Sequence, residues 1–473
     1  MDGCRNTSVM MGCFRLRPRV PKCVRMLSCP DAQDRVADLV AAARTAGADA
    51  ADAVYFRNLS TQVQVRLGVL EDVERSDGEE IGLRVFVGQR SASVSSSSLT
   101  REAVAALIER GVAMAKEAPE DRYAGLAPAE RLLTGDPAPL DADDGEDPAP
   151  DQLRARALVA EEAARGIAGV TNSEGAGASA GRSLTALATS TGFVRAYTTS
   201  GYGCSASMIA GEGAGMQRDY GYHSARHLAD LEAPEAIGVR AGERAVKRLN
   251  PGKLPSGAMP VVFDPRVGTS LLGHLVGAIT GAAIARKTSF LLGRLGEQVF
   301  SKGITIRDDP HRLRGLRSRA FDGEGLPTAP LDLIEDGMLT SWLLDSASAR
   351  QLGLEPTGHA SRGGSGAPGA STSNLYLEAG TRSVEQLIAD IELGLYVTEL
   401  IGQGVNGVTG DYSRGASGFA IRNGTLAEPV AEVTAAGNLR DMFLALVPAD
   451  DLVFRRAMDV PTLRIDGMTV AGA

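Results

Sequence analysis

Histidine and cysteine, the side chains that most often bind catalytic metals, are scarce in this chain, which has five of each in 473 residues. His223 and His227 are spaced by four positions, which would place both imidazoles on one face of a helix. However, the glutamate of an HExxH zinc site is missing between them, and residues 218–222 just before them alternate like a strand. We therefore expect this pair to be solvated or hydrogen-bonded, without a metal.

The cysteines and the other loop histidines suggest no alternative metal site. Cys204 is the only cysteine in the body of the chain, and the other four are Cys4, Cys13, Cys23 and Cys29. Their gaps of 9, 10 and 6 positions do not form the CxxC pairs of a zinc module. His311 and His359 lie among proline and glycine residues, so we expect both to be exposed on loops.

A second group of reactive side chains is the run Asp411, Tyr412, Ser413 and Arg414. Ser413 has no histidine nearby to act as its general base, so covalent catalysis is not indicated. We expect these four residues, with Asn406, to form a shaped loop at a substrate or partner cleft, where they either contact a ligand or serve only as a structural turn. There the guanidinium of Arg414 can hold a carboxylate or a carbonyl.

The glycine-dense segment 402–441 surrounds these residues and reads as folded β-structure, because β-branched runs separate its glycines. Asn423-Gly424 stands between the apolar segments 419–421 and 426–430, which predicts a hairpin. Such hairpins can present backbone groups to an extended peptide. Residues 211–215 and 402–404 look like phosphate loops, but neither has the required lysine, so we do not expect a nucleotide.

The elements that must position these residues alternate between helix and strand. Helices are predicted at residues 31–46, 100–118 (capped by Ser98 or Thr100), 151–165, 233–249 and 267–285, with short helices near 384–391 and 439–446. Strands are predicted at residues 62–67, 82–87, 92–96, within 183–208, and at 259–263. The acidic, proline-rich residues 135–150 indicate a loop or linker.

The predicted fold class is α+β with two domains. We place the boundary at the turn Asn250-Pro251-Gly252. Residues 31–250 would form an N-terminal α+β domain with antiparallel strands, and residues 251–473 a β-rich C-terminal domain. Residues 1–30 would be a basic N-terminal extension, either a disordered arm or the product of a start assigned upstream of Met26.

Composition limits the partners and the compartment. The net charge is −9, but residues 1–30 hold six basic residues and one acidic residue, so that their charge is +5 and the remainder carries −14. An acidic body without a basic stripe argues against direct nucleic-acid binding. The apolar run 9–14 is too short for a secretory signal. We expect a cytoplasmic protein with neither nucleic acid nor membrane as a partner.

Several separated blocks occur in the order of one known family. They are Gly82-Leu83-Arg84-Val85, Glu120-Asp121-Arg122-Tyr123-Ala124-Gly125-Leu126, Arg286-Lys287-Thr288-Ser289-Phe290-Leu291, Thr372-Ser373-Asn374-Leu375-Tyr376-Leu377 and Gly407-Val408-Thr409-Gly410-Asp411-Tyr412-Ser413-Arg414-Gly415. From about Asp31 onward the chain closely resembles the TldD/PmbA family, the "modulator of DNA gyrase" proteins, and most closely the PmbA/TldE branch.

The resemblance implies a zinc peptidase family, whose TldD branch carries HExxxH on a helix of the second domain and a later cysteine ligand. The matching segment here is residues 271–278, with Gly273 at the position of the first histidine, His274 at that of the glutamate and Ala278 at that of the second histidine. Glycine and alanine cannot bind a metal, and no cysteine follows Cys204. We expect neither a metal nor a catalytic residue in this chain, and expect His274 to be a hydrogen-bonded helix residue.

The resemblance therefore implies a PmbA/TldE-like, non-catalytic subunit of a TldD/TldE-type metallopeptidase. Zinc would be in the TldD-like partner, and the complex would cleave unfolded peptides. Two alternatives stay open. One is an autonomous peptidase with a non-metal site, and the other is a non-enzymatic regulatory protein, a gyrase modulator that acts as a homodimer.

Overall fold

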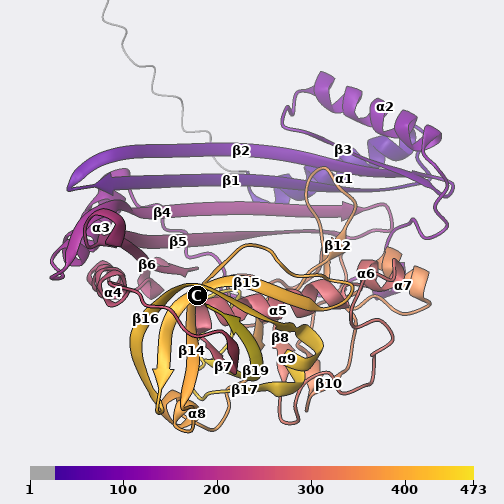
Figure 1. Cartoon of the computed structure of the whole chain (residues 1–473). Helices are drawn as coiled ribbons and strands as arrows, with labels where there is room; N and C mark the ends of the chain where they lie inside the picture. The colour runs from indigo at the N-terminus through magenta and orange to yellow at the C-terminus, as the bar shows by residue number, and fades with distance from the viewer. Residues whose placement is uncertain (1–26, 473) are drawn as a thin grey trace, which may run out of the picture.

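A computed structural model describes residues 27–472 of the chain (Figure 1). Predictions about residues 1–26 of the basic extension, its first three cysteines and the start at Met26 lie outside the described residues. Cys29 and Pro30, which we assigned to that extension, instead begin the first helix, α1 (Cys29–Thr45), which Ser28 caps. The predicted α+β class is confirmed, with an antiparallel sheet in the N-terminal half and mostly strands in the C-terminal half. None of the helices between residues 27 and 472 has the length and hydropathy that a membrane-spanning helix requires.

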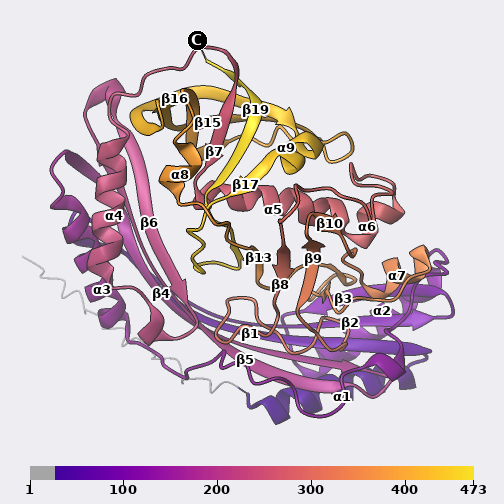
Figure 2. The same ribbon diagram turned by 90° about the horizontal axis from the view of Figure 1, so that it is seen from below.

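A single antiparallel sheet organises the N-terminal half, with the strand order β3-β2-β1-β4-β5-β6. Its strands are β1 (Ala50–Arg66), β2 (Val69–Val87), β3 (Arg90–Ser96), β4 (Val170–Thr189), β5 (Val194–Ala210) and β6 (Gln217–Ala225). The long strands curve, so that the sheet wraps around part of the C-terminal half (Figure 2).

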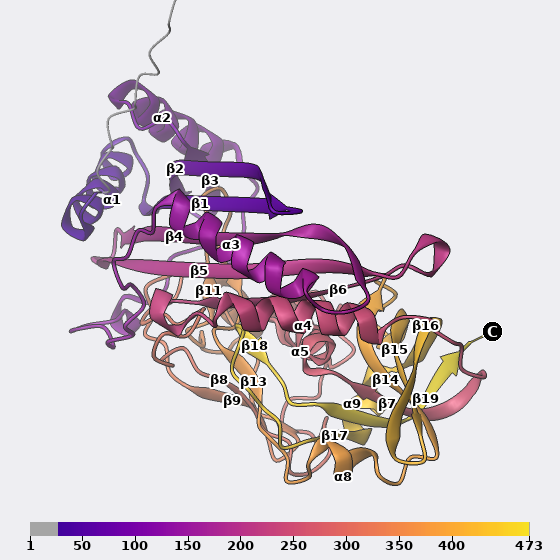
Figure 3. The ribbon, with the colours of Figure 1, turned by 90° about the vertical axis from the view of Figure 1, so that its left-hand side faces the viewer.

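Four helices cover one face of this sheet (Figure 3). They are α1 (Cys29–Thr45), α2 (Arg101–Glu117), α3 (Pro150–Arg165) and α4 (Pro234–Lys247). Strand alternation explains the two faces. On β1, Tyr55 packs in the core under α1 and α2, and Val63 in the core under α3 and α4. The alternate residues of β1, such as Val54 and Gln62, therefore face the C-terminal half.

A second sheet forms the centre of the C-terminal half, in the order β16-β15-β14-β7-β19-β17. Its strands are β7 (Gly257–Phe263), β14 (Leu393–Ile401), β15 (Asp411–Arg422), β16 (Thr425–Asn438), β17 (Leu446–Pro448) and β19 (Leu463–Ala471). An additional pairing of β16 with β19 closes five of these strands into a ring. Closure leaves few free edges in this sheet.

The hairpin predicted at Asn423-Gly424 is confirmed. Arg422 pairs with Thr425 across the two-residue turn that joins β15 to β16. Both turn residues have positive φ, 48° at Asn423 and 77° at Gly424, as the tight turns favoured in hairpins require.

The helix predicted at residues 267–285 consists of two helices, α5 (Pro265–Ile279) and α6 (Gly281–Ala285). Thr280 separates them, because its backbone is extended (φ −66°, ψ 137°) and its side chain accepts a hydrogen bond from the amide of Ala283. The hydroxyl of Thr280 therefore caps α6, a local competition with the helix that the apolar pattern did not reveal.

Shorter elements complete the half. They are β8 (Ile306–Asp308), β9 (Leu331–Glu335), β10 (Met338–Leu339), α7 (Ser346–Leu352), β11 (Ala360–Ser361), β12 (Gly369–Ala370), β13 (Leu375–Leu377), α8 (Val384–Ile388), α9 (Leu439–Ala445) and β18 (Met458–Asp459). The short helices α8 and α9 lie where the sequence predicts them.

The two halves share a small core on the inner face of the large sheet. Val54 and Leu187 from this sheet pack with Phe193, Phe321 and Leu326. The ring of Phe321 meets that of Phe193 edge to face at 5.1 Å. This contact fixes one end of the inner face against the C-terminal half, while the other end stays open.

Candidate functional site

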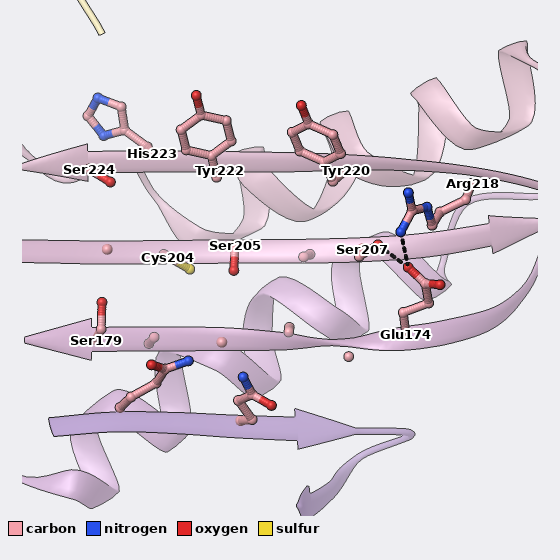
Figure 4. Close-up of a pocket in the computed structure, with 18 residues that line it drawn as sticks. Glu174, Ser179, Cys204, Ser205, Ser207, Arg218, Tyr220, Tyr222, His223 and Ser224 are labelled. Atoms are coloured by element: carbon pink, nitrogen blue, oxygen red, sulfur yellow. Dashed lines mark hydrogen bonds and ion pairs between the residues drawn. The ribbon is translucent and has the colours of Figure 1, made fainter. Parts of the chain in front are cut away.

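The open end of the inner face forms a trough with a floor of small residues (Figure 4). Directly paired residues of an antiparallel sheet point to the same face. Three rows cross the trough: Gln64, Gly177, Ser205 and Tyr222; Gln62, Ser179, Gly203 and Ser224; and Gly175, Ser207 and Tyr220. Glycine and serine leave the middle of the floor low, between the glutamines of β1 and the tyrosines of β6. The resulting volume is about 620 Å³.

Polar groups line the trough, and its apolar residues point the other way. Glu174 accepts a hydrogen bond from Ser207 at 2.7 Å and pairs with Arg218 at 3.4 Å (Figure 4). Cys204 packs in the core formed with α3 and α4, where burial raises the pKa of its thiol to about 11. The thiol is thus protonated near neutral pH and unsuited to nucleophilic attack.

A second cleft of about 290 Å³ adjoins the trough, and Arg218 and Tyr220 line both. Its other walls come from α4, α5, β14 and β15. Asp219 is the central buried carboxylate here, because it pairs with Arg266 at 2.8 Å and with Arg248 at 3.6 Å. Arg248 also pairs with Glu399. These arginines are therefore matched by acidic partners within the protein.

Arg414 lines the same cleft, but the structure describes no hydrogen bond or ion pair for its guanidinium, and its buried Nε lacks a partner. Tyr412 lies two residues earlier on β15 and so points to the same face. Its ring meets that of His274 on α5 edge to face at 6.0 Å. The hydroxyl of Tyr412 and Nε2 of His274 are also buried without partners among the described residues.

Burial and charge keep this cluster in defined protonation states. Burial lowers the pKa of His274, and the nearby charge of Arg414 lowers it further. Burial raises the pKa of Tyr412 to about 12, although Arg414 opposes the rise. At neutral pH, His274 and Tyr412 are neutral and Arg414 is charged. Our prediction that His274 is hydrogen-bonded is wrong for Nε2.

The other residues of the predicted cleft lie apart from this cluster. Asn406 is exposed and its Oδ1 accepts hydrogen bonds from the amides of Val408 and Thr409. Asp411 is exposed and accepts from Thr409 and Asn438. The prediction that residues 411–414 form a loop is wrong, because they are the start of β15. Strand alternation therefore directs Ser413 away from the face that Tyr412 and Arg414 share.

The position of the degenerate metal motif can be judged on α5. Gly273 is exposed, Ala278 is buried, and neither side chain has a lone pair to offer a metal. Within residues 27–472, His, Cys, Asp and Glu side chains form no group of three that could hold a metal ion. The donor set around His274 therefore does not fit the zinc site of the TldD branch.

The remaining histidines serve structural contacts. His223 lies on β6 and its Nδ1 accepts a hydrogen bond from the amide of Glu232, while Nε2 of His227 lies 2.9 Å from the carbonyl oxygen of Asp141. The prediction that His359 is exposed is wrong. Only 3% of its surface is accessible, and its Nε2 lies 3.3 Å from the carboxylate of Asp308.

His311 is half-buried and not a fully exposed loop residue. Its Nε2 lies 3.1 Å from the hydroxyl of Thr328. The sequence signal, proline and glycine neighbours, identifies a loop but does not show whether the rest of the fold covers that loop.

Sequence reasoning missed Tyr220 and Tyr222 as lining residues. The available signal was their spacing of two on a predicted strand, which puts both rings on one face. Arg266 and Asp219 were also missed, because they meet only through tertiary packing.

Comparisons with known proteins cover nearly the whole chain. Three domain models of the PmbA/TldA metallopeptidases match: domain 1 at residues 51–115, the central domain at 143–249 and the C-terminal domain at 256–472. Metalloprotease PmbA of Escherichia coli O157:H7 is 38% identical over 426 residues, which cover 90% of this chain and 92% of that protein.

Solved structures agree with this assignment. A crystal structure described as a modulator of DNA gyrase from Bacteroides thetaiotaomicron is 28% identical, with a TM-score of 0.86, covering 93% of this chain and 99% of that one. TldE from Thermococcus kodakarensis shares the fold at 22% identity, with a TM-score of 0.82 over 92% of this chain and 99% of its own. The family predicted from the sequence blocks is confirmed, and this chain belongs to the TldD/PmbA family.

Proposed function

We propose that this chain is the PmbA/TldE-like subunit of a TldD/TldE-type zinc metallopeptidase, and that it binds unfolded peptides without cleaving them. The proposal rests mainly on two residues of α5, a helix that borders an open cleft. Gly273 and Ala278 stand where the TldD branch has zinc ligands, whereas the adjoining trough and cleft are large and lined by polar groups. The chain thus keeps a binding surface but not the means to activate water.

An extended peptide suits the trough for two reasons. Its floor of glycine and serine leaves room for side chains of different sizes. In addition, β6 is an edge strand that pairs only with β5 among the described strands. Its other edge can add a strand of peptide outside Tyr220, whose amide donates to Asp219 and whose carbonyl accepts from Arg244. Main-chain pairing of this kind binds unfolded chains with little regard to sequence.

The glycine-rich hairpin is less suited to strand addition than the sequence indicates. On one side residues 411–414 pair with β16, and on the other the amide of Ser413 donates to Gly404. The amide of Asn406 likewise donates to Asp411. The chain itself therefore occupies both edges of β15 at this point, and we assign peptide pairing to β6.

Assembly with a TldD-like partner tests the proposal. We suggest co-expressing this chain with a TldD-like protein of the same organism that carries HExxxH, and measuring the mass of the purified complex by light scattering. The proposal predicts a stable complex of the two chains in the cytoplasm. If the chain instead forms only homodimers that bind gyrase and ignore the TldD-like protein, the regulatory alternative replaces the proposal.

A further inference from the structure

We propose that Arg414, on the wall of the second cleft, forms a carboxylate-binding site with the buried hydroxyl of Tyr412 and the buried Nε2 of His274, and that the ligand is a carboxylate of a peptide that lies in the trough. The inference rests on the proposed peptide-binding function and assigns to it a chemical preference. It concerns residues of this chain alone and does not depend on zinc in a partner.

Each of the three side chains has a buried polar atom without a hydrogen-bond partner among the described residues. Only 2% of the surface of Tyr412 is accessible, and its hydroxyl has no partner. Nε2 of His274 and Nε of Arg414 are buried and without partners as well, in the part of the chain that the structure describes. Buried polar groups in native proteins are nearly always paired. Three such groups in neighbouring residues are best explained by a ligand that completes them.

Arg414 also differs from the other arginines of the cleft in its ion pairing. The other arginines of the cleft have acidic partners, Arg218 in Glu174, and Arg248 and Arg266 in Asp219. Arg414 forms no ion pair among the described residues, so its guanidinium has no direct carboxylate partner beside the cleft. An apolar ligand would leave the buried donors without hydrogen bonds.

The donors of the three side chains match the acceptors of a carboxylate. The guanidinium of Arg414 and the hydroxyl of Tyr412 both donate, and the neutral imidazole of His274 can donate from Nε2 in one tautomer. A carboxylate accepts several hydrogen bonds at once, and charge-assisted bonds to arginine are among the strongest. The set therefore suits a carboxylate.

The position of the cleft indicates the source of the carboxylate. The cleft adjoins the trough, since Arg218 and Tyr220 line both. A peptide along β6 can thus place its C-terminal carboxylate, or an acidic side chain, beside Arg414. Both sources offer the same chemistry, and the experiment below separates them.

Binding of three unstructured peptides to the full-length chain, measured by calorimetry, tests this inference. All three share one sequence of small and apolar residues. The first has a free C-terminus, the second a C-terminal amide, and the third an amide and one internal glutamate. We expect the free C-terminus to strengthen binding about tenfold or more over the amide, as a charge-assisted hydrogen bond would. If only the glutamate peptide binds more tightly than the plain amide peptide, the ligand is a side-chain carboxylate. If neither carboxylate strengthens binding, the inference is overturned.

Variants then test whether the tighter binding of a carboxylate depends on Arg414 and Tyr412. Arg414→Gln should remove the preference for a carboxylate, so that the peptide with a free C-terminus and the amide peptide bind with similar affinity. If Arg414→Gln fails to fold, Tyr412→Phe provides the second test. It deletes only the buried hydroxyl and should reduce the preference for a carboxylate. Arg422→Gln is the matched control, because Arg422 lies on the same strand and pairs with Glu428 at the surface. It should retain the full preference.

Two results would contradict the assignment. One is an unchanged carboxylate preference in folded Arg414→Gln. The other is unchanged peptide binding together with loss of assembly with a TldD-like partner, which would make the cluster part of a subunit interface. Because peptide binding is measured on this chain alone, failure of the proposed peptidase assembly gives a different result, namely no complex while the carboxylate preference persists.

Discussion

Arg362 of the C-terminal half is ion-paired with Asp52 of β1, although 310 residues separate them in the sequence. Both side chains are 1% exposed. Arg84 donates to the same carboxylate at 3.0 Å. Burial opposes ionisation of Asp52, but the two guanidinium groups hold its pKa below the usual value. The pair therefore ties the large sheet to the C-terminal half beside the shared core.

Breaking this network should destabilise the protein strongly. Asp52→Asn leaves two buried guanidinium groups without their carboxylate, so we expect a loss of about 3–5 kcal/mol in the free energy of unfolding. Urea unfolding followed by circular dichroism measures it. Glu428→Gln, which breaks the exposed pair with Arg422, is the control and should cost less than about 1 kcal/mol. Equal effects of the two substitutions would contradict a role for Asp52 in joining the halves.

Glu324 should make stability depend on pH in the opposite sense to an ordinary carboxylate. Burial raises its pKa to about 7 from the ordinary glutamate value of 4.5, although Arg84 at 3.8 Å opposes the rise. Between these values the folded state binds more protons than the unfolded state. Stability from this group is thus present at low pH and is lost as pH rises through about 7, by roughly 3 kcal/mol in total.

The measurement compares wild type with Glu324→Gln in urea unfolding at pH 5 and pH 8. The wild type should lose about 2.5 kcal/mol more than the variant over this interval, because part of the total effect is already lost at pH 5. Asp322, whose pKa burial also raises, is present in both proteins and so does not enter the difference to first order. Parallel pH dependence in the two proteins would show that Glu324 does not titrate in this range.

The turn at Gly424 should tolerate no side chain. Its φ is 77°, and an added Cβ would lie 2.5 Å from the carbonyl oxygen of Ala389. We expect Gly424→Ala to destabilise the protein by more than about 1 kcal/mol in thermal or urea unfolding. Gly257→Ala is the control, since that position has no positive φ and no atom within 4 Å of the added Cβ. A neutral Gly424→Ala would mean that the hairpin can adopt another turn.

Local signals explain which elements the sequence could predict. The hydroxyl of Thr100 accepts from the amide of Ala103 at the start of α2, and Asn423-Gly424 forms its turn, because capping and turn chemistry depend on a few adjacent residues. The sequence blocks shared with the family indicated the fold of the rest of the chain. Strand β4 is an element that local signals did not predict in full. Its first part, residues 170–181, is so rich in glycine, alanine and serine that it carries little β-signal.

The candidate site was less predictable, because it depends on contacts between distant segments. Sequence reasoning selected Arg414 and Tyr412, but it grouped them with Ser413 and Asp411 as a loop. Only the start of β15 at Asp411 shows that alternate residues point to opposite faces. The contact between Tyr412 and His274 also requires α5 to pack against this face, which no local pattern specifies.

Cleavage by the complex should depend on Arg414. If Arg414 binds substrate, Arg414→Ala in a complex with a TldD-like subunit should lower kcat/KM for an unfolded peptide by the equivalent of about 1–3 kcal/mol. The complex should still assemble and the partner should keep its zinc. Wild-type cleavage by an assembled variant complex would show that Arg414 does not contact the substrate.

The most direct test of the central proposal is the zinc content and peptidase activity of this chain purified alone. Metal analysis by mass spectrometry and cleavage of an unfolded fluorogenic peptide should be measured on the same sample, with and without a TldD-like subunit. The account predicts no stoichiometric zinc and no cleavage alone, because Gly273 and Ala278 cannot bind the metal, and both properties in the mixture. About one zinc per chain, with cleavage that a chelator abolishes in the chain alone, would contradict it.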